Sequence, residues 1–400
     1  MSGSAVVWSL DFLLALASLP VLGAGLYLAA LALLARRPPS LVAAAPHLRF
    51  DIVVPAHNEE TEIATTVASL LALDYPRPSF RVTVVADNCT DSTAAKAAIA
   101  GARVIVRSDV EHRGKGFALA HAFTASLAEG FADVVVVVDA DTLVSANLLS
   151  AFAARFEAGA AAVQADYGVR NPRSSWRTRM MTIALAAFHG VRSLARERLG
   201  VSCGLRGNGM GFTRAVLAAH PPMAFSIVED LEYGIQLGYH GIRVHYVHDA
   251  RVLGHMAATE SSSRSQRRRW ERGRKALVRA HVPRLLAEAW RQRDLSLLDL
   301  ALDLIVPPIG HLVMLGSLGL VLSLALVPFH GVVAPWLWGA ALAGIFLHVV
   351  RAWSISGVGI AGLFDLMWAP VYVVWKLGLR FKDRGETPDE WVRTSREVRS

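Results

Sequence analysis

The chain has 400 residues, 53% of them hydrophobic, and its mean hydropathy of +0.38 is high for a purely soluble enzyme. Its formal net charge is +8, and its two cysteines, Cys89 and Cys203, lack CxxC spacing, which argues against a zinc ribbon or a disulfide framework. This length leaves room for a substantial domain plus accessory parts.

Three uncharged apolar runs raise the hydropathy: residues 12–35, 304–329 and 331–350. Each is long enough to cross about 30 Å of hydrocarbon as a helix that rises roughly 1.5 Å per residue. The first run has no Lys or Arg before it and no convincing cleavage site, which indicates a retained anchor rather than a signal peptide. A fourth run, residues 352–375, is interrupted by Asp365 and Pro370, and we predict that it re-enters, lies in the interface or merges with its neighbour.

Basic residues predict the orientation of these runs. Arg36 and Arg37 directly follow the first run. Four basic residues follow the last one: Lys376, Arg380, Lys382 and Arg384. The positive-inside rule therefore places both the middle region and the tail in the cytoplasm. Arginines next to anionic lipid explain most of the excess positive charge.

Between residues 48 and 280, short apolar runs alternate with Ala-rich stretches. We predict strands at residues 49–56, 81–87 and 133–141, and helices at residues 62–73 and 92–100. Continuous Val and Ile runs separated by helices are typical of an α/β fold with a mostly parallel sheet and helices on both faces. Ligands bind beyond the carboxyl ends of such strands, where the polar segments PAHNEE, ADNCTD and DADT lie.

Acidic residues end two of these strands. Asp139 and Asp141 follow five consecutive valines, and residues two apart in a strand project to the same side. Their carboxylates suit a Mg²⁺ or Mn²⁺ ion that bridges a diphosphate; the alternative is a turn with two solvated aspartates. Asp87 ends its strand and would contact a ribose or base, whereas an Asx-turn or helix cap accounts for Asn88 and Asp91.

The loop HRGKG, residues 112–116, places Lys115 between two glycines. Glycine lets the backbone approach an anion closely, and the ammonium supplies a point charge. The other residues of a P-loop are missing, which argues against an ATPase. His112 is either a ligand contact or a solvated loop histidine.

Two further segments carry candidate site residues. SIVEDLEYG puts Glu229 and Asp230 at a predicted helix start. Mutual repulsion there would seat a general base, or the acids would merely complement the helix dipole. The glycine-rich segment CGLRGNGMGF contains Asn208 and forms either a backbone wall beside a flat substrate or a set of turns.

The segment SQRRRWERGRK, residues 265–275, carries six basic residues and one tryptophan. We predict a helix here, preceded by a short loop at residues 261–263. Arginine binds phosphate bidentately, and an indole face stacks on a sugar ring. A lipid-surface role explains four of the arginines: Arg267, Arg268, Arg272 and Arg274. The short cluster with little aromatic interleaving argues against nucleic acid as a partner.

Taken together, residues 48–275 resemble the membrane-bound, inverting family 2 glycosyltransferases, which include cellulose, chitin, hyaluronan and poly-N-acetylglucosamine synthases. The resemblance implies a GT-A-type, Rossmann-like domain flanked by transmembrane helices. It rests on the order of four motifs: Asp87, the DxD pair Asp139 and Asp141, the pair Glu229 and Asp230, and the QxxRW motif Gln266, Arg269 and Trp270.

The resemblance implies a role for each matching residue on the donor side. Pro55, Ala56 and Glu59 would lie along the nucleotide base, and Asp87 would hold the base or ribose. Lys115 would touch the diphosphate.

On the transfer side, Asp139 would contact the nucleotide sugar and Asp141 would ligate the divalent metal, Mg²⁺ or Mn²⁺. Asp230, paired with Glu229, would take the proton from the acceptor hydroxyl. Diphosphate and acceptor sugar would be bound by Gln266, Arg269 and Trp270.

The implied function is inverting transfer of a sugar from a UDP-sugar to a growing β-linked polysaccharide. Two departures bear on it: the segment between His255 and Gln266 has no proline, and no gating-loop motif follows Trp270. The C-terminal part also has fewer apolar runs than the largest polymer synthases. The alternative is a single addition to a lipid or polyprenyl-linked acceptor; a membrane scaffold or nucleotide-sugar-sensing pseudoenzyme is disfavoured because all the acids are present.

The predicted organisation has five parts along the chain. They are an anchor (1–37), the cytosolic transferase domain (48–280), an interfacial region (281–303), transmembrane or re-entrant helices (304–377) and a basic tail (378–400). We predict a multi-pass protein of a bacterial inner membrane with a cytoplasmic catalytic domain. Membrane lipids are expected partners.

Overall fold

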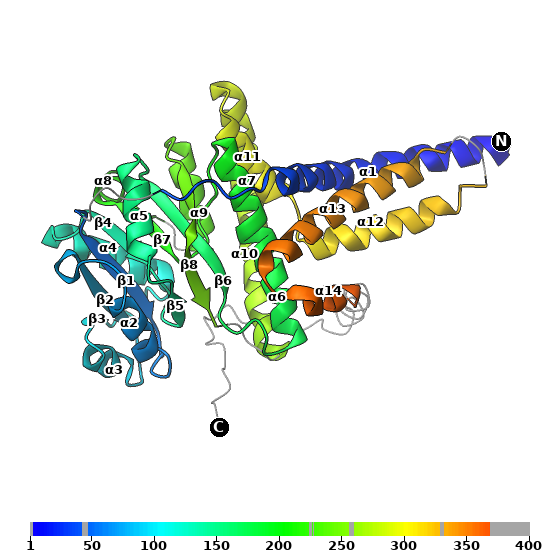
Figure 1. Ribbon diagram of the computed structural model, residues 1–400. Helices are drawn as coiled ribbons and strands as arrows, with labels where there is room; N and C mark the ends of the chain where they lie inside the picture. The colour runs from blue at the N-terminus through cyan, green and yellow to red at the C-terminus, as the bar shows by residue number, and fades with distance from the viewer. Residues whose placement is uncertain are drawn as a thin grey trace.

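The computed structural model describes residues 3–41, 47–223, 226, 228–255, 260–328 and 332–368, without the side chains of residues 3–4 and 260–272. An α/β domain occupies one end of the molecule, and long helices extend from it (Figure 1). Helices α6, α7, α10 and α11 lie between the sheet and the bundle formed by α1, α12 and α13. The basic tail and the end of the fourth apolar run fall outside the described residues.

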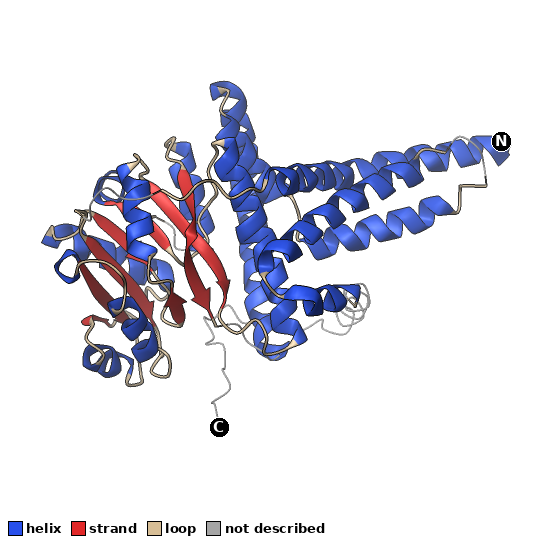
Figure 2. Cartoon of the chain, viewed as in Figure 1, coloured by secondary structure: helices blue, strands red, loops and turns tan. Residues whose placement is uncertain are grey.

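One eight-stranded sheet forms the α/β domain, in the order β3-β2-β1-β4-β7-β6-β8-β5 (Figure 2). The strands are β1 (Phe50–Ala56), β2 (Phe80–Asp87), β3 (Arg103–Arg107), β4 (Val134–Val137), β5 (Thr142–Val144), β6 (Ala162–Val169), β7 (Met210–Thr213) and β8 (Val244–Gly254). The three strands predicted from apolar runs are β1, β2 and β4. Their observed bounds lie within or close to the predicted ones.

The prediction of a mostly parallel sheet is confirmed in part: the sheet is mixed, with four parallel and three antiparallel strand pairings. Strands β1 to β4 pair in parallel, as do β6 and β8. Strand β7 runs antiparallel to both β4 and β6, and β5 runs antiparallel to β8. The chain leaves β6 through a helical excursion and re-enters at the opposite end of the sheet, so β7 runs backwards. Its four residues, MGFT, give no periodic signal of this reversal.

Side chains of the central strands alternate between two hydrophobic cores. Ile52 and Val54 of β1 belong to one core and Val53 to the other, as the period of two in a strand requires. The predicted burial of the sheet on both faces is therefore confirmed. The covering helices are α2 (Ile63–Leu71), α3 (Thr93–Ile99), α4 (Lys115–Glu129), α5 (Leu148–Glu157), α8 (Arg214–Ala219) and α9 (Glu229–Tyr239), with the short η1 (Arg77–Ser79).

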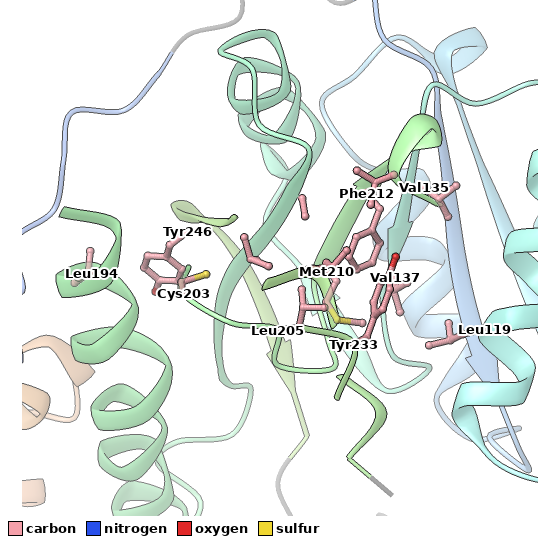
Figure 3. Packing of buried hydrophobic residues seen from close by; sticks show 14 of the residues in the cluster. Leu119, Val135, Val137, Leu194, Cys203, Leu205, Met210, Phe212, Tyr233 and Tyr246 are labelled. Carbon is pink, nitrogen blue, oxygen red and sulfur yellow. The ribbon is translucent and has the colours of Figure 1, made fainter. Parts of the chain in front are cut away.

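Figure 3 shows part of the hydrophobic core that includes the side chains of β7. Met210 and Phe212 of β7 pack with Leu119 of α4 and Tyr233 of α9. The rings of Phe212 and Tyr233 lie 5.4 Å apart between centroids. Full burial of such a side chain contributes about 1.5–3 kcal/mol. This packing fixes the first turns of α4 and α9, which carry Lys115 and the Glu229–Asp230 pair, against one strand.

The connecting helices begin with α6 (Trp176–Leu185), η2 (Ala186–Val191) and α7 (Arg192–Leu199), where η2 is a π-helical segment. Helix α10 (Glu260–Gln292) and α11 (Leu295–Ile305) follow the sheet. The predicted loop at residues 261–263 is wrong, since these serines lie inside α10. Serine is a moderate helix former, and Glu260 at the first position suits a helix start.

The long apolar helices are α1 (Gly3–Leu34), α12 (Ile309–Leu324) and α13 (Ala334–Ser356), followed by the short α14 (Gly359–Met367). Within the described ranges, α1 and α13 are each long and apolar enough to cross a membrane. The pair α11 and α12 would add a third span only if it is counted as one helix bent by 68°. The apolar run 304–329 is thus broken at Pro307 and Pro308, as expected of proline.

Helices α1 and α13 meet at two glycines. A Cβ atom on Gly25 would lie 2.5 Å from the Ala341 carbonyl oxygen, and one on Gly344 would lie 2.5 Å from the Gly25 carbonyl oxygen. Small residues let helix backbones approach closely within a membrane. Glycine at these two positions therefore allows α1 and α13 to approach this closely where they cross.

Candidate active site

Lys115 is the centre of the candidate site. It is the first residue of α4, after Gly114, whose φ of 125° is a conformation that favours glycine. Its Nζ donates to Asp139 Oδ1 and to the Gly207 carbonyl oxygen, both at 2.6 Å, and lies 3.9 Å from Glu229 Oε1. Burial lowers the pKa of the Lys115 amine, but Asp139 and Glu229 outweigh this effect and raise it above its usual value.

Asp230 lies on the same side as this cluster. A Cβ atom on Gly207 would stand 3.2 Å from Asp230 Oδ2 and 3.6 Å from Lys115 Nζ. Four residues predicted from three separate motifs therefore meet around one loop: Lys115, Asp139, Glu229 and Asp230.

The pair Glu229 and Asp230 is largely buried at the start of α9, with the Glu229 side chain 14% exposed. Burial, opposed by Lys115 and reinforced by Asp230, raises the pKa of Glu229 to about 7. Burial also raises the pKa of Asp230, against the pull of Lys115. The expected mutual repulsion contributes to the raised pKa of Glu229, but desolvation is the larger cause. Near neutral pH the Glu229 carboxyl, with its pKa of about 7, is therefore partly protonated.

Asp141 lies within electrostatic reach of Tyr167 on β6, close to Asp139. Burial, followed by the charges of Asp139 and Asp141, raises the pKa of the Tyr167 hydroxyl. Among the described residues, no three His, Cys, Asp or Glu side chains are grouped so as to hold a metal ion by themselves. Mg²⁺ typically binds one or two carboxylates and completes its shell with substrate phosphates and water. The acidic turn fits a cation that arrives with a diphosphate.

Asp87 lies at the end of β2 and is fixed on two sides. Arg107 Nη1 donates to Asp87 Oδ1 at 2.6 Å, and Asn88 Nδ2 donates to the same oxygen at 3.1 Å. His57 Nδ1 lies 2.7 Å from the Asp87 carbonyl oxygen. Arg107, on β3, was not among the predicted residues. A basic residue at the end of an edge strand gives no sequence signal by itself.

Pro55, Ala56 and Glu59 lie at the end of β1, beside β2. Pro55 and Ala56 are in register with Val85 and Ala86. The Glu59 backbone N–H donates to Thr93 Oγ1 at 2.8 Å.

The loops after β1 and β2 are joined by a second bond, from the Thr90 N–H to Asn58 Oδ1 at 2.8 Å. Together they form a rim at the carboxyl ends of both strands, next to Asp87.

The QxxRW residues Gln266, Arg269 and Trp270 lie on α10, but their side chains fall outside the described residues. The neighbouring turn is described. A Cβ atom on Gly273 would lie 2.9 Å from the Val228 side chain, and Val228 directly precedes Glu229. Trp270 is three residues before Gly273, about one helical turn. The helical turn that follows this motif therefore packs against the residue that precedes Glu229.

Comparison with known proteins gives one family match. The model of the family described as glycosyltransferase like family 2 matches residues 46–273, more than half of the chain.

Two curated proteins are similar to this chain. Beta-monoglucosyldiacylglycerol synthase of Synechocystis sp. is 30% identical over 283 residues, covering 68% of this chain and 56% of that protein. A probable glycosyltransferase of Bacillus subtilis, YdaM, is 25% identical over 241 residues, covering 58% and 56%. The chain thus spans a little over half the length of both relatives.

A solved structure shares the fold. The mannosyltransferase PcManGT from Pyrobaculum calidifontis, in complex with GDP-Man and Mn²⁺, superposes with a TM-score of 0.54 at 20% identity. The match covers 92% of this chain and 99% of that one. It extends over both the α/β domain and the helices that follow.

Proposed function

Since this chain belongs to the glycosyltransferase-like family 2, we propose that it transfers a sugar from a nucleotide-diphosphate sugar to a hydroxyl group presented at the membrane surface. The predicted family is confirmed, whereas the resemblance to the polymer synthases in particular stays a prediction. The observation that carries the proposal is the convergence of Asp139, Glu229 and Asp230 on Lys115.

The donor nucleotide would bind at the ends of β1 and β2. Asp87, held by Arg107 at 2.6 Å, would accept from the base or ribose, with Pro55, Ala56 and Glu59 along the base. We favour a UDP-sugar, as the resemblance implies.

The diphosphate would lie between Lys115 and the turn that carries Asp139 and Asp141. We assign Mg²⁺ or Mn²⁺ to Asp141; when bound, such an ion neutralises the charge that develops on the leaving diphosphate. Lys115, now paired with Asp139 and Gly207, would reach the phosphate oxygens from the opposite side. Gln266, Arg269 and Trp270 would complete the site from α10.

Asp230 would take the proton from the acceptor hydroxyl, while the neighbouring Glu229 is partly protonated near neutral pH. Burial of both carboxyls keeps the base weakly solvated and reactive near neutral pH. A single displacement by the activated hydroxyl inverts the anomeric centre. A retaining double displacement would need a second carboxylate as nucleophile, and we assign none.

For the acceptor we favour a lipid-borne hydroxyl over a growing polysaccharide. The Synechocystis relative is by its name a diacylglycerol glucosyltransferase, and the α/β domain here adjoins helices suited to a membrane. Elongation of a β-linked polysaccharide, which the sequence first suggested, is the second candidate. The catalytic domain would face the cytoplasm of a multi-pass membrane protein.

The test uses the full chain in detergent or in lipid nanodiscs with diacylglycerol. A panel of UDP- and GDP-linked sugars with Mn²⁺ or Mg²⁺ should identify a donor, and mass spectrometry should find one sugar per lipid. A ladder of longer products would favour the polysaccharide candidate instead. No transfer and no donor hydrolysis across the panel would reject the transferase proposal and favour a scaffold or sensor.

A further inference from the structure

The glycine-rich segment contains a loop, residues 206–209, that bonds to Lys115, to the end of β4 and to the acidic turn. Gly207 accepts from Lys115 at 2.6 Å, and Gly209 donates to the Val137 carbonyl oxygen at 2.9 Å. Gly207 and Gly209 have φ values of 79° and 69°, in the left-handed region. A Cβ atom on Gly209 would lie 2.8 Å from the Val252 side chain. The sequence GNG is therefore required by backbone conformation and by space.

Gln164 of β6 is hydrogen-bonded to the backbone of this loop. Its side chain is fully buried, and its Nε2 donates to the Asn208 carbonyl oxygen at 2.7 Å and to the Ala165 carbonyl oxygen at 2.9 Å. Its Oε1 accepts from the Arg206 N–H at 2.8 Å. Both amide N–H groups and the carbonyl of Gln164 are thus used. Such a satisfied buried amide specifies one loop conformation.

Asn208 extends the contact to the acidic turn. Its Oδ1 accepts from the Asp139 N–H at 3.1 Å, and its Nδ2 donates to Thr142 Oγ1 at 2.8 Å. Asn208 and Thr142 are both 0% exposed. The turn itself is closed by a bond from the Thr142 N–H to the Asp139 carbonyl oxygen at 3.2 Å. One side chain therefore bonds to both ends of the Asp139–Thr142 turn.

We propose that Asn208 is a positioning residue that fixes the Asp139-Ala140-Asp141-Thr142 turn, with Gln164 holding Asn208 in place. The inference rests on the proposed function, in which this turn receives the metal-bound diphosphate. Asn208 bonds to the backbone N–H of Asp139 and to the side chain of Thr142. It would therefore act on the turn without touching the ligand. A turn freed at either end would let the two carboxylates separate. The metal-dependent part of nucleotide binding would then weaken.

The experiment is a double-mutant cycle on the bond between Asn208 and Thr142 in the full chain in detergent. Isothermal titration calorimetry measures UDP affinity with and without Mn²⁺ for Asn208→Ala, Thr142→Val and the double variant. We expect each single change to weaken the Mn²⁺-dependent part of UDP binding by about 10- to 100-fold, the usual effect of losing a partner behind a metal ligand. UDP binding without Mn²⁺ should stay the same, which a general loss of structure would not produce.

Because both changes remove the same Asn208–Thr142 hydrogen bond, the double variant should be less impaired than the product of the single effects. Thr142→Ser, which keeps the hydroxyl, should restore binding. Thr142→Val is nearly isosteric and tests the bond even if Asn208→Ala fails to fold. The matched control is Asn147→Ser, since the Asn147 amide bonds to the Asp249 carbonyl oxygen at 3.0 Å instead of the acidic turn.

Two failures are distinguishable in this experiment. If the wild-type chain binds no UDP or GDP with Mn²⁺ or Mg²⁺, the proposed function fails and the positioning role falls with it. If the wild type binds but Thr142→Val and Asn208→Ala bind equally well, or their effects simply multiply, only the positioning role is overturned.

Discussion

Glu229 and Asp230 are neighbours in sequence, and burial raises the pKa of both carboxyls. This makes the site sensitive to pH. The pKa of Glu229 is raised from 4.5 to about 7, first by burial and then by Asp230, against Lys115. A carboxyl whose pKa is higher in the folded than in the unfolded chain favours folding while it is protonated. Its contribution to stability is therefore lost as the pH rises from 4.5 to about 7.

We predict that Glu229→Gln removes this loss. Between about pH 5 and about pH 8, the melting temperature of the wild type should fall more than that of the variant. Identical pH dependence of melting in both proteins would contradict the raised pKa.

The base assignment makes a separate prediction for Asp230. Asp230→Asn keeps the shape of the side chain but cannot accept a proton, so transfer should fall by at least about 100-fold. UDP binding, measured by calorimetry with Mn²⁺, should stay nearly intact. A comparable loss of UDP binding would show that Asp230 serves the donor site and is not the base.

Arg107 is the residue at the nucleotide end whose role the sequence did not indicate. It donates to Asp87 at 2.6 Å and to Asp109 at 2.9 Å, and its side chain is only 10% exposed. Arg107→Met should leave Asp87 without its counter-charge and badly oriented, raising KM for the donor by about 10-fold or more with little change in kcat. Steady-state kinetics would measure both constants.

The matched control for Arg107 lies on the same strand. Arg103 of β3 pairs with Glu129 at a partly exposed position, 39% and 35% exposed. Arg103→Met should leave the donor KM unchanged. Equal effects of the two substitutions would mean that Arg107 serves only the stability of the strand.

At the scale of elements, the crossing of α1 and α13 depends on glycine at one position and not at its neighbour two residues away. A side chain at Gly25 would meet the Ala341 backbone at 2.5 Å, whereas one at Gly23 would meet nothing within 4 Å. The two positions lie in the same helix, so they have the same intrinsic helix propensity. The difference between them is packing alone.

We predict that Gly25→Leu lowers stability by separating the two helices, at a cost of about 1–3 kcal/mol or more. Gly23→Leu should leave the protein as stable as the wild type or slightly more so, since leucine favours helix. Thermal unfolding of the purified protein in detergent compares the two. If both substitutions shift the melting temperature equally, the close approach of α1 and α13 is not present.

At the scale of the whole molecule, a buried charged network joins the long apolar helix α1 to the connecting helices α7 and α11. Arg196 of α7 is fully buried, with its Nε 2.8 Å from Asp299 Oδ2 and its Nη1 2.9 Å from Asp303 Oδ2. Its Nη2 donates to the Tyr27 hydroxyl of α1 at 3.1 Å. Arg192 donates to Asp303 at 2.8 Å. Three elements distant in sequence, α1, α7 and α11, are thus held together by paired charges.

Removing one partner of this network should be costly because it leaves buried arginine without its counter-charge. We expect Asp303→Asn to cost about 3–5 kcal/mol, seen as a lower melting temperature in detergent. Glu288→Gln is the control, because Glu288 pairs with Arg291, whose side chain is 73% exposed, and it should change little. Equal shifts in the two variants would exclude a special role for the network.

Much of the architecture follows from local patterns. The valine-rich runs become β1, β2 and β4, and their acidic ends bring Asp87, Asp139 and Asp141 to one edge of the sheet. The apolar runs predict α1 and α13. The reversal of β7 was not predictable, because four residues containing a glycine carry no information on strand direction, which depends on where the preceding helices return the chain.

The sequence by itself determined the family, the strands that carry the acids, and the chemistry of the groups that would act, since residue type and order are local properties. Only the tertiary structure decided that Lys115 sits between those acids, that Arg107 holds Asp87, and that Asn208 bonds the turn 69 positions away. Those contacts depend on loop geometry and on a mixed sheet. No periodicity along the chain encodes either of them.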